Sequence, residues 1–446
     1  MQVLFADDVP EQEALTWARL PTEVLMMIFR HLPRRDLLSC TAVCYHWATS
    51  ARVPSLWYGV LSRQWPDAYK LKKRGMAAGW FEVVRFSDVV DRNWASRSFL
   101  TRRVASQAKG VIDFLVCGRE VVTCGLQKTI VVTNMVSQAR TELPAHEHHV
   151  CGLSQVVPGA LMAACSYDTT VSLWGMRDWK RVGVLAGHTG PVLDCKVLNS
   201  QQLLSRGGRD CTLRLWDTES AACVSVLKAH SSSVTGLKIA DRSTVLSSSR
   251  DGSVAVWDLR SSRPVAVSAH HTADAYALHL PKSSAHLVYS CSADGSIVGY
   301  DFAQQKIVSR VATPQVAYVV KTSPDGRHVL AGGGGGALMS MAAFSNDAPH
   351  CTAHHGGVMS CLRVVNRRLV SGSLDSGVAV WEESAQEGRF SVAQSLPNSH
   401  GADIVRKVRA DQLGFFSAGY DGHVVEVDFQ GAPQRDEEKS TGCQVC

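Results

Sequence analysis

Histidine and aspartate recur together through most of this sequence of 446 residues. In six places a histidine precedes an aspartate by 21 to 24 residues. A histidine held by a carboxylate can act as a general base or bind a metal ion. Neither a nucleophile nor a third ligand recurs with the pairs, so we expect them to be structural. The pairs are His146 with Asp168, His188 with Asp210, His230 with Asp251, His270 with Asp294, His354 with Asp375, and His400 with Asp421.

Three other patterns are typical of chemistry, but the sequence around each argues against it. The histidine doublets at 148–149, 270–271 and 354–355 could bind metal, yet the repeating pairs already use one histidine of the last two. The run Gly332 to Gly336 lacks the Lys-Ser/Thr that a phosphate-binding loop requires. The fourteen cysteines are scattered without a repeated metal spacing. We therefore predict no catalytic residue, no metal site and no cofactor.

Length and composition indicate a folded chain of more than one module. The chain exceeds the size at which a single hydrophobic core usually stops growing. Charged residues make up 19%, and the net charge of +6 is spread without a run of five like charges, which gives nucleic-acid binding little support. No apolar stretch reaches about eighteen residues, and the acidic start lacks the features of a secretory signal. We expect no membrane span and a cytoplasmic or nuclear location.

The first predicted domain, residues 16–65, is a small all-α bundle. Its apolar residues recur at spacings of three and four, as they do on helices. A first helix starts after Pro21 and ends at Pro33. Asp36 can cap a second helix, and Pro54 opens a third. Three helices in so short a segment have little core of their own, so the bundle needs a partner for its remaining apolar surface.

This segment resembles an F-box. The resemblance rests on Leu20-Pro21-x-Glu23-Val24-Leu25, Ile28-Phe29, Leu32-Pro33, Asp36-Leu37-Leu38, Val43-Cys44, Trp47 and Leu56-Trp57. It implies docking onto the Skp-type adaptor of a cullin–RING ubiquitin ligase, through apolar anchors on short helices. A generic three-helix bundle or a dimerisation helix pair is the alternative. The docking residues that the resemblance implies are Leu20, Pro21, Ile28, Leu32, Pro33, Leu37, Val43 and Trp47.

The second predicted domain, residues 98–430, repeats with a period of about forty residues. Six segments contain an aspartate six residues before an apolar position, as in Asp210 and Trp216. Two weaker copies have Gln127 and Gly335 in place of the aspartate. The segments resemble WD repeats, which imply an all-β propeller with four strands in each blade.

The copies also predict the number of blades and the closure of the ring. Eight copies predict eight blades, and seven is the alternative should residues 105–145 prove irregular. No strand is left after Phe429 to complete the last blade. We therefore expect residues 98–104 to supply that strand, so that both ends of the domain share one blade and its edges are hidden.

The WD resemblance gives the recurring residues a structural role. In that family the aspartate lies in the turn between the second and third strands, and its carboxylate engages the histidine, a strand Ser or Thr and the Trp indole. Such a network satisfies a buried carboxylate and fixes the blade. The members predicted here are His188, Asp210, Trp216, His230, Asp251, Trp257, His354, Asp375 and Trp381.

Three further segments flank or join the domains. Residues 1–15 are predicted to be flexible, 66–97 to connect the two domains, and 431–446 to form a disordered tail. The tail places Cys443 four residues from the end, in the layout of a prenylation box. A redox or metal half-site and an accidental tail are the alternatives, and a single lipid would anchor only weakly.

Arginines beside the turn aspartates are candidates for client binding. In F-box/WD receptors of phosphorylated peptides such arginines help to hold the phosphate, and Arg209 and Arg250 occupy that position. The strand arginines that complete the site in those relatives have no clear counterpart, and Arg406 and Lys407 are substitutes one position off. The alternative is that Arg209 and Arg250 are solvated turn residues.

Together the two resemblances imply a non-catalytic substrate-recognition subunit of a Skp–cullin–F-box ubiquitin ligase. The F-box would bind the adaptor, and through it the cullin–RING ligase, while the propeller would bind a client protein, phosphorylated or not. The alternative is a WD-repeat scaffold for a stable assembly. The two differ in whether a bound protein gains ubiquitin and turns over faster.

Overall fold

The computed structural model divides the chain into two compact units. One contains residues 1–99 and 429–446, and the other contains residues 100–428. The predicted flexible start, most of the connector, and the tail with Cys443 lie outside the described residues, as does Pro33. The described residues are 20–32, 34–53, 56–57, 89–365, 368–384, 388–397, 399–401, 403–411 and 413–430.

The first unit contains short helices around a small apolar core. They are α2 (Thr22–Phe29), α3 (Arg34–Ser39), the 3-10 turn η1 (Cys40–Ala42) and α4 (Tyr45–Ala51). Leu25 and Phe29 lie four residues apart on one face of α2 and are fully buried. The Phe29 ring meets the Trp47 ring edge-on, with centroids 5.5 Å apart. The helix α4 was not predicted; it starts where the Cys44 Sγ accepts a hydrogen bond from the Trp47 amide at 3.5 Å.

Two details of the predicted helices differ from the structure. The second helix begins at Arg34, so Asp36 lies in its first turn and does not cap it; a carboxylate there is still favourable, because it faces the positive end of the helix dipole. Residues 56–57 are helical, as predicted for the third segment, and both side chains are buried.

A separate helical segment, residues 89–96, also belongs to the first unit. Its Asn93 side chain donates to the Phe429 carbonyl at 2.6 Å. The Trp94 and Phe429 rings stack with centroids 3.7 Å apart. These contacts join the segments that immediately precede and follow the second unit in the chain.

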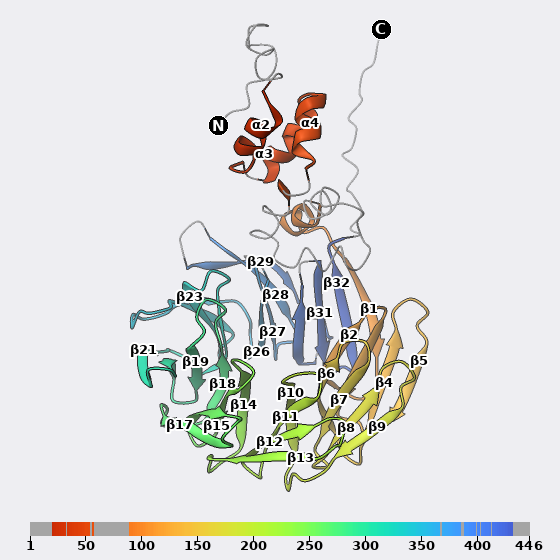
Figure 1. Ribbon diagram of the computed structural model, residues 1–446, viewed down its shortest axis with the longest axis vertical. Helices are drawn as coiled ribbons and strands as arrows, with labels where there is room; N and C mark the ends of the chain where they lie inside the picture. Colours follow the sequence, from red (N-terminus) through yellow and green to blue (C-terminus); the bar gives the residue numbers. More distant parts are fainter. Residues whose placement is uncertain are drawn as a thin grey trace. The chain divides into compact units, whose positions relative to one another are not determined.

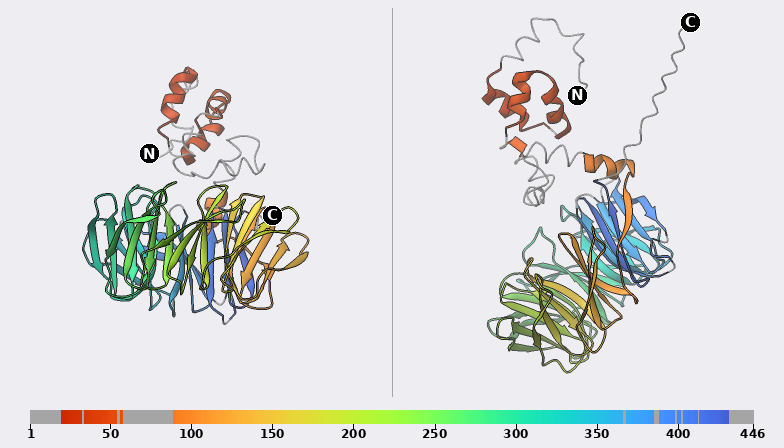
Figure 2. Two further views of the ribbon diagram at one scale, coloured as in Figure 1. Left: turned by 60° about the horizontal axis from the view of Figure 1, so that its bottom comes forward. Right: turned by 90° about the vertical axis from the view of Figure 1, so that its right-hand side faces the viewer.

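The described part of the second unit forms eight four-stranded antiparallel sheets, which confirms the eight-bladed propeller (Figures 1 and 2). The segment 105–145 folds as a regular blade, so the seven-bladed alternative is wrong. The blades, in chain order, are β2–β5 (Val111–Cys117, Glu120–Gly125, Thr129–Asn134, Arg140–Pro144), β6–β9 (Val150–Val157, Leu161–Ser166, Val171–Gly175, Arg181–Leu185), β10–β13 (Val192–Val197, Gln202–Gly207, Thr212–Asp217, Cys223–Lys228), β14–β17 (Val234–Ile239, Thr244–Ser249, Ser253–Asp258, Arg263–Ala269), β18–β21 (Ala275–His279, Leu287–Ser292, Ser296–Asp301, Lys306–Ala312), β22–β25 (Ala317–Thr322, His328–Gly333, Ala337–Ala342, His350–Ala353), β26–β29 (Met359–Val365, Arg368–Ser373, Val378–Glu383, Phe390–Leu396) and β30–β32 with β1 (Val405–Ala410, Gly414–Gly419, His423–Asp428, Leu100–Ser106).

The core of the propeller lies between neighbouring blades. The first strands of successive blades contact one another in a closed ring from β2 to β30 and back to β2. Outside this ring, apolar clusters join neighbouring blades; one of them combines Cys165 of the second blade with Val192 and Trp216 of the third.

The ring closes through β1, as the sequence predicts. β1 pairs antiparallel with β32, from Leu100 opposite Asp428 to Ser106 opposite His423. The pairing covers the edge of β32 that would otherwise expose unpaired backbone groups. Val104 of β1 is fully buried in a cluster that also contains Phe114 of the first blade.

We predict that Val104→Asp lowers the free energy of unfolding by about 3 kcal/mol, because it buries a carboxylate without a partner in the closing strand. Thr101→Asp on the exposed part of the same strand is the control and should change it by less than about 0.5 kcal/mol. Denaturant unfolding of the two variants measures the difference. Equal, small effects would show that β1 contributes little to closure.

Candidate functional site

In the third blade a relay of hydrogen bonds joins the predicted structural residues. The Trp216 indole donates to Ser205 Oγ at 2.7 Å. Ser205 Oγ lies 2.7 Å from His188 Nε2, and His188 Nδ1 contacts the Asp210 carboxylate. The carboxylate therefore reaches the indole through the histidine and the serine. His230, Ser247 and Trp257 repeat the relay at 2.7 and 2.8 Å, with Asp251 3.3 Å from His230.

The protonation states fit a structural role for the relay. Burial alone would raise the pKa of Asp251, but hydrogen bonds from Ser253 and Ser231 outweigh burial and lower it to about 2. Burial lowers the pKa of His230 despite the neighbouring carboxylate. The ring is then a neutral imidazole with both nitrogens engaged. Such a histidine has no free nitrogen with which to accept a substrate proton.

Two of the predicted histidines are wrong by one residue. Asp375 pairs with His355, at 3.1 Å, and not with His354. His355 is buried and its Nε2 lies 2.8 Å from Ser371 Oγ, which accepts from Trp381. His354 is exposed and contacts Ser395.

The other doublet shows the same shift. Asp294 lies 3.3 Å from His271 Nδ1, whereas the His270 ring lies against Tyr300, with centroids 4.3 Å apart. In both doublets the second imidazole is the one within 2.8 Å of the serine on the second strand. Spacing along the chain is a poor guide here: both His270 and His271 lie within the range of the other pairs, and His355, 20 residues before Asp375, lies one residue outside it.

The glycine run of the sixth blade results from close backbone approach. A Cβ on Gly336, which has φ +76°, would lie 2.1 Å from the His355 carbonyl. Gln315 takes the place of the missing histidine, and its Oε1 accepts a hydrogen bond from the Gly335 amide at 2.9 Å. The run is therefore part of a turn with a glutamine bond in place of the histidine–aspartate pair.

The helical unit exposes a set of large apolar side chains. Val24, Met27 and Ile28 are exposed on α2, and Met27 lies on the face opposite Leu25 and Phe29. Met27 is 66% exposed, and Tyr45 at the start of α4 is 86% exposed. We call Val24, Met27, Ile28, Val43 and Tyr45 the exposed apolar set.

The predicted adaptor-binding residues are divided by the structure. Ile28 and Val43 belong to the exposed apolar set, and Pro21 is exposed. Leu20, Leu32 and Trp47 are partly buried. Leu37 is fully buried, so its assignment to the docking surface is wrong: in this structure it belongs to the bundle's own core.

Sequence reasoning missed Val24, Met27 and Tyr45. A signal was present, because α2 carries apolar residues on both faces. A helix that is apolar all round is normally buried on all sides, which predicts a partner for the second face.

The predicted client-binding residues have different surroundings. Arg209 and Arg250 are exposed at equivalent turns of neighbouring blades, and Arg250 Nε lies 3.7 Å from Asp274. Arg406 is exposed on β30. Lys407 is not available in the same way, because its ammonium group forms a 2.6 Å ion pair with the buried Asp113.

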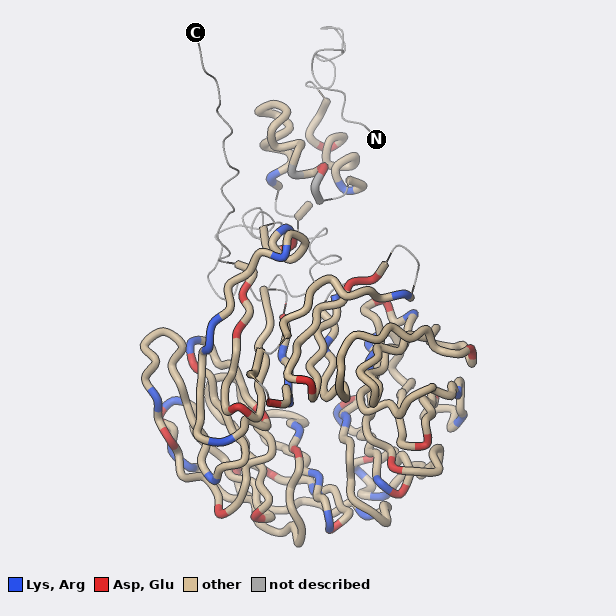
Figure 3. The backbone as a smooth tube through the Cα atoms, turned by 180° about the vertical axis from the view of Figure 1, so that it is seen from behind, with Lys and Arg blue, Asp and Glu red and all other residues tan. Residues whose placement is uncertain are grey.

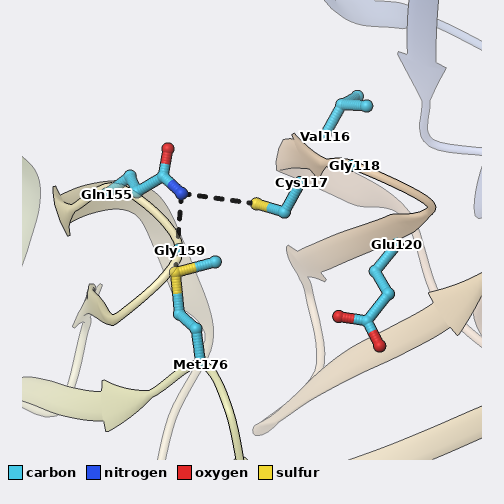
Figure 4. Close-up of a pocket in the computed structure, with 7 residues that line it drawn as sticks. All are labelled: Val116, Cys117, Gly118, Glu120, Gln155, Gly159 and Met176. Atoms are coloured by element: carbon cyan, nitrogen blue, oxygen red, sulfur yellow. Dashed lines mark hydrogen bonds between the residues drawn. The ribbon is translucent and has the colours of Figure 1, made fainter. Parts of the chain in front are cut away.

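A cavity of about 390 Å³ lies between the first and second blades (Figure 4). Gln155 bridges its walls through weak contacts with Cys117 Sγ, at 3.9 Å, and Met176 Sδ, at 3.6 Å. Burial and the nearby Glu120 raise the pKa of the Cys117 thiol to about 11. A protonated thiol is a poor nucleophile, so the cavity does not resemble a cysteine-enzyme site.

Neither a metal site nor a membrane-spanning helix occurs among the described residues. They contain no group of three or more His, Cys, Asp or Glu side chains placed to hold a metal ion. Among them, too, no helix is both long enough and apolar enough to cross a bilayer.

The ring of four-stranded blades with histidine–serine–tryptophan relays defines a WD-repeat propeller. The family model "WD domain, G-beta repeat" matches residues 137–175, 179–217 and 221–258, and the model "F-box-like" matches residues 17–63. The chain is therefore an F-box/WD-repeat protein.

Individual relatives are distant and match only in part. A *Caenorhabditis elegans* protein, F-box/SPRY domain-containing protein 1, is 29% identical over 23% of this chain and 35% of its own length. Eukaryotic translation initiation factor 3 subunit I of *Schizosaccharomyces pombe* is 31% identical over 16% of this chain and 22% of its own. The computationally designed Ika8 protein has a TM-score of 0.64 at 19% identity, covering 73% of this chain and 98% of that one, which shows the propeller fold alone.

We predict that His355→Ala lowers the free energy of unfolding by about 2 kcal/mol, because Asp375 and Ser371 lose a buried partner. His354→Ala is the matched control one residue away and should cost less than about 0.5 kcal/mol. Denaturant unfolding compares the two. A larger loss of stability for His354→Ala than for His355→Ala would show that His354 is the relay histidine.

Proposed function

We propose that the protein is the substrate-recognition subunit of a Skp–cullin–F-box ubiquitin ligase. Its F-box would dock onto a Skp-type adaptor, and its propeller would hold the client. The observation that carries the proposal is the exposed apolar set on the F-box unit. Large side chains this exposed on a small bundle are typical of an interface, because burying each against a partner contributes about 1.5–3 kcal/mol.

The arrangement on α2 suits a protein partner. Leu25 and Phe29 hold the helix to its own core, while Met27 on the opposite face and the exposed Val24 and Ile28 remain available for a groove. Apolar residues three and four apart on one helix face are the anchors of helix-in-groove recognition. Val43, just before α4, and Tyr45, its first residue, extend the exposed apolar surface beyond α2.

In this proposal the protein performs no chemistry itself. Recruitment raises the effective concentration of the client near the ligase, which is sufficient to direct ubiquitin transfer. Burial lowers the pKa of the relay histidines His230, His271 and His355, and burial raises the pKa of the Cys117 thiol in the cavity, so neither group supports an enzymatic alternative. Loops at the ends of the blades are the expected client-binding surface, because the strands are committed to the core.

Arg209 and Arg250 are the proposed client contacts. Both are exposed at equivalent turns, in blades three and four. Guanidinium groups bind phosphate by paired hydrogen bonds, so a phosphorylated client would suit them. Arg406 is a third candidate from the eighth blade.

We predict that Met27→Glu weakens binding of a Skp-type adaptor by at least about tenfold, since it places a charge in an apolar contact. Val182→Glu is the control, because Val182 has the same 66% exposure on β9 of the propeller. Titration of purified adaptor against each variant gives the ratio, and melting curves report folding. Equal affinities for the two variants would remove Met27 from the interface.

We predict that the double variant Arg209→Ala/Arg250→Ala loses its clients in pull-downs from cell extract and retains the adaptor. Phosphatase treatment of the extract should abolish client capture by the unaltered protein in the same way. The control, Arg263→Ala/Lys306→Ala, removes two exposed cations from the outer strands β17 and β21. Clients retained by the double variant would exclude phosphate recognition at these turns.

A further inference from the structure

Basic side chains occupy one register position on the innermost strands of six successive blades. In the fourth blade, Leu237 on the first strand pairs with Ser247, the relay serine on the second strand, and Lys238 is the next residue after Leu237. The basic residue of each of the other five blades has the equivalent position. The same register holds for Lys321 and Arg363 in the sixth and seventh blades. We call this set the axial ring: Lys196, Lys238, His279, Lys321, Arg363 and Arg409.

The ring side chains lie on the axial side of their strands. The preceding residues, such as Leu237 and Leu362, are buried in the clusters between blades. Because successive side chains of a strand point to opposite faces, the ring residues point away from those clusters. A propeller surrounds a central channel. Figure 3 marks Lys and Arg positions in blue, and several of them lie on strands near the middle of the ring.

Carboxylates neutralise only part of this charge. The first strands of the eight blades carry two acidic residues, Asp113 and Asp194. Asp194 pairs with Lys196 at 2.9 Å, and Asp113 pairs with Lys407 and Arg409. Lys238, Lys321 and Arg363 form no ion pair with any residue that the structure describes. The Lys and Arg residues on the first strands are Lys196, Lys238, Lys321, Arg363, Arg406, Lys407 and Arg409.

The three unpaired cations reach solvent although protein surrounds them. Arg363 is exposed, and Lys238 and Lys321 are partly exposed. Burial, and then the charges of Lys238 and Arg363, lower the pKa of Lys321 to about 7. Burial also lowers the pKa of Lys238 to about 8, with Lys196 and Arg363 contributing.

Some of the charges that lower these pKa values come from blades that are not neighbours. Lys238 belongs to the fourth blade and Arg363 to the seventh, so their charges interact across the axis. Cations that repel one another in this way are retained at a cost that a bound anion would remove.

We propose that the axis of the propeller binds a compact polyanion bearing several phosphate groups, held by Lys238, Lys321 and Arg363. Positive charges that converge on one axis from several blades suit a small, multiply charged molecule. An extended phosphopeptide would present its charge along one side. Ammonium and guanidinium groups are the usual protein ligands of phosphate. The site is separate from the turn arginines, and it does not depend on the ubiquitin-ligase proposal.

The test is calorimetric titration of the full chain with inositol hexakisphosphate, ATP and inorganic tripolyphosphate at physiological salt. We expect at least one of them to bind. The comparison among the three separates a cyclic polyphosphate from a nucleotide or a linear chain. Failure of all three would overturn the proposal, and binding only of a phosphorylated client peptide at the ring would replace it with peptide recognition.

The ring variant Lys238→Gln/Lys321→Gln/Arg363→Gln should weaken this binding by at least about tenfold. Its matched control, Lys228→Gln/Arg263→Gln/Lys306→Gln, removes the same charge from exposed positions on outer strands and should bind normally. Equal losses in both variants would show attraction by net charge alone and contradict a site.

Thermal melting curves show whether each variant is folded. Without ligand, the ring variant should melt at or above the temperature of the unaltered protein, because it removes like-charge repulsion. The ligand should raise the melting temperature of the unaltered protein and not of the ring variant. If the ring variant unfolds instead, the single variant Lys238→Gln decides: undiminished affinity there would overturn the proposal.

Binding should also take up protons near neutral pH. A polyanion raises the pKa of Lys321 and Lys238, so affinity should fall from about pH 6.5 to about pH 9 as these lysines lose their protons. The groups that act on Lys321 are Lys196, Lys238, Cys291 and Arg363. Those that act on Lys238 are Lys196, Arg363 and Lys407, which lower its pKa, and Asp194, which raises it. His279 is neutral in this range, because burial and then Lys321 and Lys238 lower its pKa to about 3. The ring variant controls for titration of the polyphosphate itself: a pH dependence of affinity that is the same in both proteins would exclude the two lysines as ligands.

Discussion

The relay from a turn aspartate through a histidine and a serine to an indole is the contact on which the propeller depends. In the third blade His188 comes from the loop before β10, Asp210 from the turn after β11, and Ser205 from β11 itself. One imidazole therefore fixes three backbone segments with both of its nitrogens. A buried carboxylate without those partners would be costly, so the relay also specifies the turn that presents Arg209 to solvent.

The two binding surfaces that we propose on the propeller, the turn arginines and the axial ring, therefore use residues that take no part in the relays. The strands and their relays satisfy the fold, so binding falls to side chains at the turns and on the axial side of the first strands. The exposed apolar set on the F-box unit likewise consists of residues that the core of that unit does not use. Leu25 and Phe29 meet the needs of the small core, which leaves Met27 for a partner.

Periodicity explains why the sequence predicts so much of the fold. Eight copies at a spacing of about forty residues predict eight blades, and the absence of a strand after Phe429 predicts closure by β1. The choice between adjacent histidines was not predictable. The spacing to Asp375 favours His354, and only the three-dimensional structure shows that the His355 imidazole reaches Ser371. The exposure of Met27 and burial of Leu37 likewise depend on tertiary packing. The axial ring was detectable, because Lys196, Lys238, His279, Lys321 and Arg363 follow one another by 41 or 42 residues.

We propose that the F-box brings proteins bound by the propeller to a ubiquitin ligase. The most direct measurement combines the purified chain and its co-purified clients with a Skp-type adaptor, a cullin–RING ligase, the E1 and E2 enzymes, and ubiquitin. The account predicts ubiquitin on the clients, and its loss when Leu20 and Pro21 are both replaced by alanine. Clients that stay bound but gain no ubiquitin in a complete, active assembly would contradict the account and identify the protein as a scaffold.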